Sequence, residues 1–359
     1  MSTGFQMRDY SLTGPENAAA RAKGLASAEW YRCAIPRKRM KELMQRRDGP
    51  AIRDTITWFA ALIGSGALLY LAWGTWWAVP AFLLYSVIYA GPSDSRWHEC
   101  GHGTAFKTRW MNDVLYQIAS FMVVREPTSW RWSHARHHTD TIIVGRDPEI
   151  AATRPPSFLT LALNALHIKN TIAELRRVVL HSLGRMTEAE KDYIPESEYP
   201  KVFRAARAWL AVYLAVIAAC FAMGSVMPLF FIGLPSLFGA WLHLFFGLTQ
   251  HAGLAEDTLD HRLNSRTVYM NPVFRFMYWN MNYHIEHHMF PMVPYHALPA
   301  LHEAIKADTP PPYPSCWAAY REIIPTLLRQ AKDPTYFVRR PLPGAQLEPS
   351  TSFAAAPAA

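Results

Sequence analysis

Residues 55 to 93 read TITWFAALIGSGALLYLAWGTWWAVPAFLLYSVIYAGPS, about forty residues without Asp, Glu, Lys or Arg. A second uncharged stretch of similar length runs from Ala208 to Leu248. Because a bilayer needs only ~20 apolar residues per spanning helix, each stretch has room for two spans. Gly74-Thr75 breaks the first stretch, and residues 223 to 228, with a glycine and a proline, break the second.

The sequence therefore predicts an all-α integral membrane protein with four transmembrane helices in two hairpins. The expected spans are 56–73, 76–93, 208–223 and 227–247. Two crossings return the chain to the side it left, so the remaining segments share one compartment as a helical cap. The basic segment from Arg32 to Arg53 indicates the cytoplasm for this cap, for the active site and for both termini. The alternative is that the apolar stretches are core helices of a large soluble protein.

Three domains are expected. Residues 1–54 form a cytoplasmic N-terminal tail, 55–305 a catalytic domain, and 306–359 a C-terminal cytoplasmic segment that ends in a disordered tail. Short apolar pieces at 114–124 and 158–166 cannot span a bilayer and are expected at the interface or under the site.

Charge and cysteine content exclude some functions. The net charge of +8 indicates adhesion to a membrane surface, or docking of an acidic electron donor, and no nucleic-acid partner is expected. The four cysteines are scattered without a Cys-x-x-Cys pair, so neither a disulfide framework nor an iron-sulfur motif is encoded.

Histidine boxes carry the chemistry of this sequence. They read His98-Glu99-Cys100-Gly101-His102, His134-Ala135-Arg136-His137-His138 and His284-Ile285-Glu286-His287-His288. Residues three and four apart share one face of a helix, so each box directs two or three imidazoles to one point. With His251, which follows Gln250, nine histidines are predicted metal ligands: His98, His102, His134, His137, His138, His251, His284, His287 and His288.

Histidine ligands alone do not identify the metal, because neutral imidazole binds Fe, Zn, Cu and Ni alike. The number of histidines is more informative. A catalytic zinc takes three protein ligands and a structural zinc four. Nine histidines exceed both numbers, so two metals with four or five each are expected. The first box alone also matches the His-Glu-x-x-His motif of zinc metalloproteases, which remains a remote alternative.

Few acidic or amide side chains lie near the boxes. They are better placed to orient ring N–H groups than to bind metal. The candidates for this role are Glu99, Asp140, Asn280 and Glu286, with Asn282 as a further one.

This order of boxes, with a lone histidine after the last span, resembles the membrane-bound fatty acid desaturase and hydroxylase superfamily over roughly residues 50 to 305. The context of residues 283 to 291, Tyr-His-Ile-Glu-His-His-Met-Phe-Pro, is similar to the bacterial acyl-lipid branch. In acyl-CoA desaturases an asparagine stands four residues before the lone histidine, where this chain has Gly247. At a closer level, the chain is similar to bacterial enzymes of secondary metabolism, including those acting on dihydrorhizobitoxine, an amino-acid enol-ether precursor.

The resemblance implies an O2-dependent enzyme with two iron ions that introduces a double bond into a fatty-acyl or related aliphatic chain, in the inner membrane of a bacterium. Oxygen rebound on the same ligand set would give an alcohol, so a hydroxylase remains an alternative. No haem, flavin or iron-sulfur motif is present, so electrons are expected from an external donor, ferredoxin-like or similar, and its reductase.

Substrate choice stays open at this stage. A lipid substrate predicts an apolar tunnel, which the many Trp, Phe and Met residues could line. A small polar substrate requires charged groups near the metals, for which Arg131, Arg136, Arg146 and Asp147 are candidates.

Overall fold

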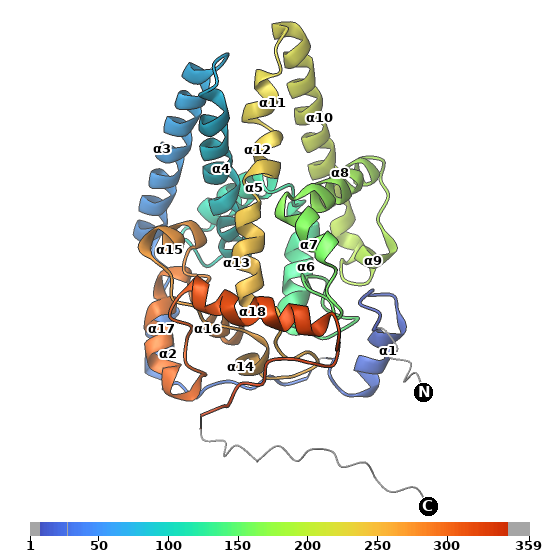
Figure 1. The fold of residues 1–359 in the computed structure, drawn as a ribbon, viewed down its shortest axis with the longest axis vertical. Helices are drawn as coiled ribbons and strands as arrows, with labels where there is room; N and C mark the ends of the chain where they lie inside the picture. Colours follow the sequence, from blue (N-terminus) through green and yellow to red (C-terminus); the bar gives the residue numbers. More distant parts are fainter. Residues whose placement is uncertain (1–7, 27, 344–359) are drawn as a thin grey trace, which may run out of the picture.

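The computed structural model describes residues 8–26 and 28–343 (Figure 1). Within these residues the chain is helical, apart from two isolated β-bridges, Thr267↔Tyr283 and Val268↔Tyr313. The α-helices are α1 Pro15–Ala22, α2 Arg37–Leu43, α3 Asp48–Ala72, α4 Ala78–His102, α5 Arg109–Met122, α6 Pro127–Thr139, α7 Phe158–Ala165, α8 Ile168–Ser182, α9 Glu188–Lys191, α10 Tyr199–Met223, α11 Met227–Phe231, α12 Leu234–Phe238, α13 Trp241–His251, α14 His261–Asn264, α15 Pro272–Tyr278, α16 His284–Met289, α17 Leu298–Ile305 and α18 Cys316–Gln330. Three short 3₁₀ helices are η1 Glu196–Glu198, η2 Tyr295–Ala297 and η3 Lys306–Asp308.

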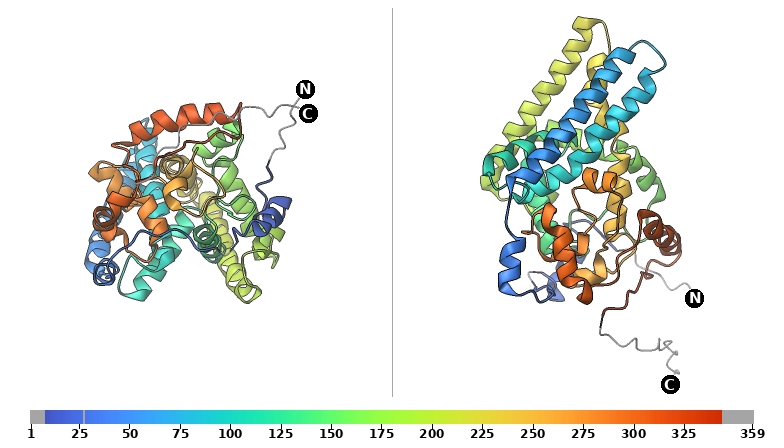
Figure 2. Two further views of the ribbon diagram at one scale, coloured as in Figure 1. Left: turned by 90° about the horizontal axis from the view of Figure 1, so that it is seen from below. Right: turned by 90° about the vertical axis from the view of Figure 1, so that its left-hand side faces the viewer.

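Helices α3 and α4 form the first predicted hairpin and lie side by side in two views (Figures 1 and 2). The break predicted at Gly74-Thr75 is confirmed, since Gly74 has a φ of 83° in the turn between the helices. A positive φ of this kind is unstrained only for glycine. The buried Trp58 donates from its indole Nε1 to Ile88 O at 2.8 Å, which ties the two helices together.

The second apolar stretch begins with α10, which ends at Met223 before Gly224 with a φ of 57°. The sequence predicts one helix over 227–247, but the structure has three short helices there, α11, α12 and α13, stacked end to end in Figure 1. Gly233, with a φ of 104°, separates the first two, and Pro235 cannot donate the backbone hydrogen bond that would join them.

Close backbone contact positions this broken segment. A Cβ on Gly239, which follows α12, would lie 1.8 Å from Ser86 O of α4, so only glycine permits this approach. Helix α13 continues from there down to His251.

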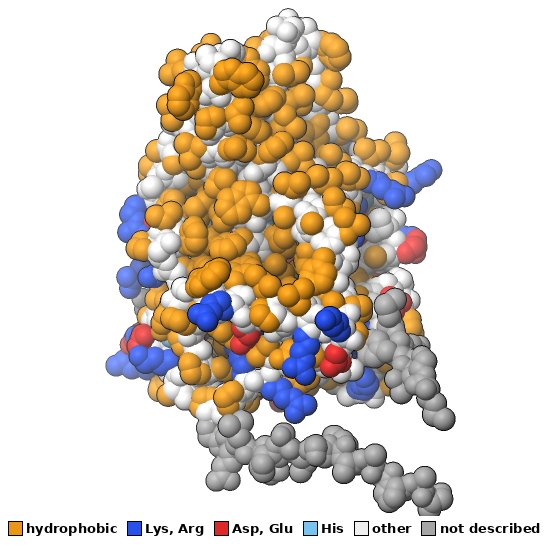
Figure 3. Space-filling view, in the orientation of Figure 1, with side chains coloured by type: hydrophobic (Ala, Val, Ile, Leu, Met, Phe, Trp, Pro, Cys, Tyr) orange, Lys and Arg blue, Asp and Glu red, His pale blue; other side chains and the backbone are white. Residues whose placement is uncertain are grey.

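Two helical stretches, Arg37–Ala72 and Glu196–Met223, are long and apolar enough to cross a membrane. Only 22% and 17% of the residues in their most apolar windows are buried inside the protein. A helix in the core of a soluble protein would be mostly buried, so the exposure favours contact with lipid. Hydrophobic side chains cover the upper part of the molecule in Figure 3, whereas charged ones gather in the lower part.

The lower part holds the helices that bear the histidine boxes. Helix α5, which includes the predicted short apolar piece at 114–124, packs against α4 through Leu115 and Ala119. Helix α18, beyond the predicted catalytic domain, packs on α13, where Tyr320 donates to Phe245 O at 2.6 Å. The segment before α3 is also attached, because Tyr10 donates to Glu256 at 2.8 Å. The tail predicted at 354–359 lies outside the described residues.

Candidate metal centre

All nine predicted histidines come together, although they belong to four helices. Helix α4 contributes His98 and His102, α6 the second box, α13 the lone histidine at its last residue, and α16 the third box. Their potential ligand atoms form two groups, each within 4.8 Å of one another. The first cluster contains His98, His102, His134, His138 and His287, and the second contains His137, His251, His284 and His288.

In the first cluster, the Nε2 atom of His134 is the hub. It lies 3.1 Å from the Nε2 atoms of His98, His102 and His138. The His287 Nε2 atom closes the group at 2.7 Å from His98 Nε2 and 3.1 Å from His138 Nε2.

The second cluster is built the same way around His284. Its Nε2 atom lies 2.9 Å from His251 Nε2 and 3.0 Å from His288 Nε2. The ring of His137 stands 4.8 Å from that of His288 and completes the group.

The outer nitrogens fix how several rings are protonated. The Nδ1 atom of His134 lies 3.0 Å from a carboxylate oxygen of Glu149, and that of His137 lies 2.8 Å from Asp147. The Nδ1 atom of His251 lies 2.8 Å from the backbone oxygen of Asn264. Ionised carboxylates and backbone carbonyls can only accept, so in the neutral rings Nδ1 carries the proton and Nε2 offers a lone pair to the cluster.

The arrangement of these lone pairs shows whether the clusters are suited to a metal ion. An unprotonated Nε2 of His134 faces three other Nε2 atoms at 3.1 Å, and shared protons cannot satisfy all of these contacts. A cation among them can. With metal–nitrogen bonds of ~2.1 Å, adjacent ligands lie ~3.0 Å apart at 90° and ~3.4 Å apart in a tetrahedron. The observed closest separations of 2.7 to 3.1 Å are short enough for neighbouring rings to share one cation.

The electrostatic surroundings keep most rings neutral. Burial, and then the neighbouring imidazoles, hold the pKa values of His284, His287 and His288 well below the ordinary range. Burial alone would lower the pKa of His137 too, but the Asp147 carboxylate outweighs it and raises that pKa. Neutral imidazole is the form that binds metal.

Three of the four side chains predicted to orient the rings contact other groups in the described part of the chain. Asp140 pairs with Arg136 and, at 3.0 Å, with Arg146. Asn280 donates to Tyr295 O at 3.0 Å. The predicted role of these two residues is corrected accordingly, because their hydrogen bonds in the described part of the chain go to groups other than the box imidazoles.

Glu286 also differs from expectation. Glu286 accepts from Thr267 Oγ1 at 2.6 Å and from His302 Nδ1 at 2.5 Å, since the residue before His287 on a helix points ~100° away from it. Glu99 Oε1 lies 3.7 Å from His287 Nδ1, and neither atom has a hydrogen-bond partner in the described part of the chain, whereas Glu99 Oε2 accepts from Thr104 and from the backbone of Tyr295. The predicted orienting role of Glu99 stays a prediction. Asn282 donates to Val268 O.

The carboxylates that do hold rings, Asp147 and Glu149, were missed as a pair. The sequence predicts Asp147 only as a contact for a polar substrate, and it predicts no role for Glu149. Both lie in the loop after the second box, so spacing along the sequence gave no direct signal. Their only signal is that they are the acids nearest to that box on its C-terminal side after Asp140. The other substrate-binding candidate, Arg131, lies 3.9 Å from Asp113.

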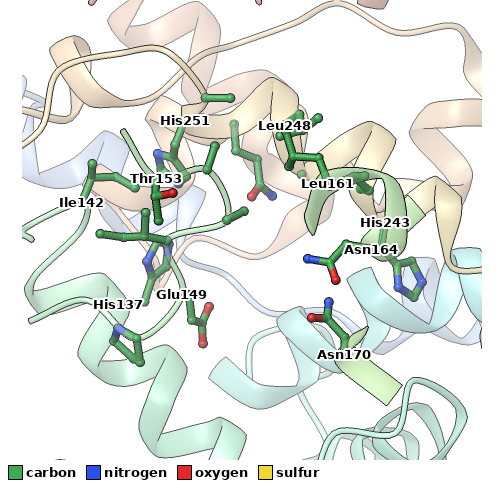
Figure 4. A pocket seen from close by; sticks show the side chains of 18 of the residues that line it. His137, Ile142, Glu149, Thr153, Leu161, Asn164, Asn170, His243, Leu248 and His251 are labelled. Atoms are coloured by element: carbon green, nitrogen blue, oxygen red, sulfur yellow. The ribbon is translucent and has the colours of Figure 1, made fainter. Parts of the chain in front are cut away.

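A cavity of ≈ 470 Å³ adjoins both clusters. Five of the nine histidines line it, and Trp97, Trp130 and several polar residues form other parts of the wall. Figure 4 shows His137, His251 and Glu149 at one end, with His243, Asn164 and Asn170 at the other. His243, inside α13, hydrogen-bonds Ala90 O at 2.7 Å. The cavity places a ligand within reach of the histidine clusters.

Two groups of histidines that could each hold a metal ion thus lie in a chain with helices long enough to cross a membrane. The family model for fatty acid desaturases matches residues 74–320, most of the chain. The chain therefore belongs to the fatty acid desaturase family. It is an oxidoreductase that acts on paired donors with reduction of O2.

Individual relatives are distant. A probable fatty acid desaturase of Sorghum bicolor is 26% identical over 301 residues, which are 78% of this chain and 74% of that protein. An sn-2 acyl-lipid omega-3 desaturase (ferredoxin), chloroplastic, of Arabidopsis thaliana is 22% identical, covering 77% of this chain and 64% of that one. An acyl-lipid omega-3 desaturase (cytochrome b5), endoplasmic reticulum, of the same plant is 22% identical, covering 74% and 72%.

Proposed function

We propose that this protein is a di-iron desaturase that introduces a double bond into an aliphatic chain. The observation that carries the proposal is the pair of clusters, with five and four histidines converging through Nε2 atoms. These residues would hold two iron ions and leave positions open for oxygen. Iron bound there would supply the oxygen chemistry needed to remove hydrogen from unactivated C–H bonds.

Side chains around the clusters would fix the orientation of the histidine rings that bind the metals. Glu149 and Asp147 accept the Nδ1 protons of His134 and His137, and Thr141 Oγ1 lies 3.2 Å from His288 Nδ1. Because such partners fix the tautomer and the ring plane, the Nε2 lone pairs point to the metals before these bind. The cavity then seats the chain to be desaturated against the His98 and His284 rings that line it.

We also propose that four transmembrane segments in two hairpins carry the site at the cytoplasmic side of a bacterial inner membrane. The antiparallel pair α3 and α4, and α10 with the stacked α11 to α13, support this topology. The broken segment is acceptable at membrane depth where protein buries it, as at Gly239.

The electrons would come from a separate carrier. The printed names of two relatives refer to ferredoxin and to cytochrome b5, which supports an external one-electron donor with its reductase. The basic segment from Arg32 to Arg47 offers a surface for an acidic donor.

Mass spectrometry of host cells tests the proposal. Cells with the wild-type chain are compared with cells that carry the His284/His287/His288→Ala variant, in lipid and aqueous extracts alike. A product two hydrogens lighter, present only with the wild-type chain, is the expected result. A product that gains oxygen would instead establish a hydroxylase. The same product from the triple variant would overturn the di-iron assignment, while a protease centred on His98 and His102 would survive that change.

A further inference from the structure

A row of three rings connects the second cluster to the surface of the molecule. The ring of Trp30 lies flat on that of His261, with ring centroids 4.2 Å apart and ring planes at 4°. The His261 ring in turn stands 5.1 Å from the ring of His288, a member of the second cluster. His261 and His288 are buried, whereas Trp30 is partly exposed, so the row runs from solvent to the metal centre.

Trp30 is held in place by its own segment, residues 28–36, which crosses the lower end of the molecule between α1 and α2 (Figures 1 and 2). Its indole Nε1 donates to the backbone oxygen of Thr139, the last residue of α6, at 3.1 Å. The backbone N–H of Cys33 donates to the sulfur of Met289, the last residue of α16, at 3.1 Å. The segment is therefore attached to both helices that carry adjacent histidine pairs.

The row of rings lies apart from the cavity that adjoins the clusters. None of Trp30, His261 and His288 lines that cavity. His261 also belongs to neither cluster. A compound bound in the cavity therefore does not occupy this approach to the second cluster, and a second reactant can use it.

The surface beside Trp30 is a groove with a basic rim. It begins two residues further along the chain, and its rim is formed by the exposed side chains of Arg32, Arg37 and Lys41. Its floor is apolar and consists of Ile35, Met40, Met44 and Phe290.

Acidic side chains near the groove are largely paired. Glu42 pairs with Arg39 at 3.1 Å, and Asp308 pairs with Arg262 at 2.8 Å. Glu29 is an exposed acid on the same segment, but the three rim residues form no ion pair within the described part of the chain. The groove therefore carries a net positive charge, which is complementary to an acidic protein.

Electron tunnelling weakens steeply with distance and is more efficient through packed aromatic atoms than across a gap. We propose that an acidic one-electron carrier protein docks on this groove, and that the Trp30–His261 pair conducts its electrons to the second cluster. The inference rests on the proposed di-iron function and adds to it the docking place and the route. Each carrier would lose one electron as one ferric ion becomes ferrous. Two encounters would supply the two electrons that, with two protons from solvent and two hydrogens from the substrate, reduce O2 to two water molecules.

Light-driven reduction tests the route without a partner protein. Full-length protein with oxidised iron, in nanodiscs, carries a ruthenium sensitiser on Arg32→Cys in a Cys220→Ser background, since the other three cysteines are buried. A flash makes the sensitiser a reductant, and the loss of ferric absorbance gives the rate of reduction. Trp30→Leu should slow this reduction at least tenfold, whereas Trp30→Phe, which keeps a ring, should retain most of the rate.

Trp317→Leu is the matched control for the route. Trp317 is exposed on α18 and is not part of the row, so its loss should leave the rate within twofold of wild type. All three tryptophan variants should retain two iron ions per chain, which shows that the fold is intact. An unchanged rate in Trp30→Leu, or an equal loss in Trp317→Leu, would overturn the route.

Reduction by a protein carrier tests the docking surface. The probe is a reduced, acidic plant-type [2Fe–2S] ferredoxin, mixed rapidly with the oxidised protein at low salt. The rim reversal Arg32→Glu/Lys41→Glu should slow reduction at least tenfold, and added salt should slow the wild-type reaction towards that rate. Arg321→Glu/Lys332→Glu makes the same change in net charge at exposed positions outside the groove and should stay within twofold of wild type.

Three results would refute the docking surface. They are equal rates in the two double variants, no reduction of the wild-type protein by the ferredoxin, and a rim reversal that slows reduction only in nanodiscs of anionic lipid. The last result would assign the groove to lipid head groups.

Neither readout requires a substrate, so the route and the desaturase function can fail separately. If reduction depends on Trp30 and on the rim but no desaturated product forms, the route stands and the proposed function fails. If the product forms but iron is reduced equally fast in every variant, the function stands and the route is refuted.

Discussion

His137 and His138 are consecutive residues of α6, yet they belong to different clusters, with ring centroids 5.9 Å apart and ring planes at 73°. The helix explains this division, because successive side chains are turned by ~100°. His287 and His288 of α16 are divided in the same way. Two adjacent pairs thus couple the two clusters through short stretches of backbone.

Single substitutions in this pair should remove different metals. His137→Ala is expected to empty the second cluster and His138→Ala the first, each lowering the iron content from two ions per chain to about one and abolishing desaturation. Iron analysis of the purified variants checks this, with His296→Ala, outside both clusters, as control. If either variant kept two iron ions, the division into clusters would be wrong.

Glu149→Gln should weaken iron binding. Burial raises the pKa of Glu149, but its contact with His134 outweighs burial and lowers that pKa to about 2, so the group is ionised near neutral pH. Losing a carboxylate that holds a ligand ring typically costs ~10- to 100-fold in metal affinity. Competition with a chelator measures the effect.

Glu99→Gln is the matched control for that experiment. Its carboxylate makes no hydrogen bond to a ring, with 3.7 Å to His287 Nδ1, so the loss of affinity should be smaller than for Glu149→Gln. The reverse order of the two variants would argue against the orienting role of Glu149.

Gly239→Ala should destabilise the protein. The added Cβ would lie 1.8 Å from Ser86 O, and because backbone must move, the cost should reach the upper part of the ~1–3 kcal/mol range for overpacking. Thermal unfolding in detergent provides the measurement. Gly247→Ala, whose Cβ meets nothing within 4 Å, should unfold close to the wild-type temperature. Equal stability of the two variants would disprove the close contact between α12 and α4.

Metal exchange distinguishes a di-iron oxidoreductase from a zinc metalloprotease. Chelation should abolish product formation, ferrous iron should restore it, and zinc should not, because zinc has no redox chemistry. Product formation is followed by mass spectrometry with an electron donor and O2 present. Activity restored by zinc alone would exclude a di-iron enzyme.

Sequence reasoning located the nine histidines, but the expectation that each box points to one place is wrong, because the adjacent histidines of the second and third boxes enter different clusters. It could not find Glu149, since the loop after α6 folds back on His134 through tertiary contacts that spacing does not encode. The same holds for the broken segment over 227–247. Its hydropathy indicates a span, but the break at Gly233 and the contact at Gly239 depend on packing against α4.

The ligands of the two clusters are synthesised at different times, because they lie at different places along the chain. Four ligands of the first cluster lie between His98 and His138, whereas three of the four in the second lie at or beyond His251. The last ligand of the first cluster, His287, follows His138 by 149 residues. At ~5–20 residues per second, the ribosome needs roughly 7 to 30 s to add that length. The early histidines thus emerge well before either cluster can close, and iron can be enclosed only once the third box, residues 284 to 288, has been synthesised.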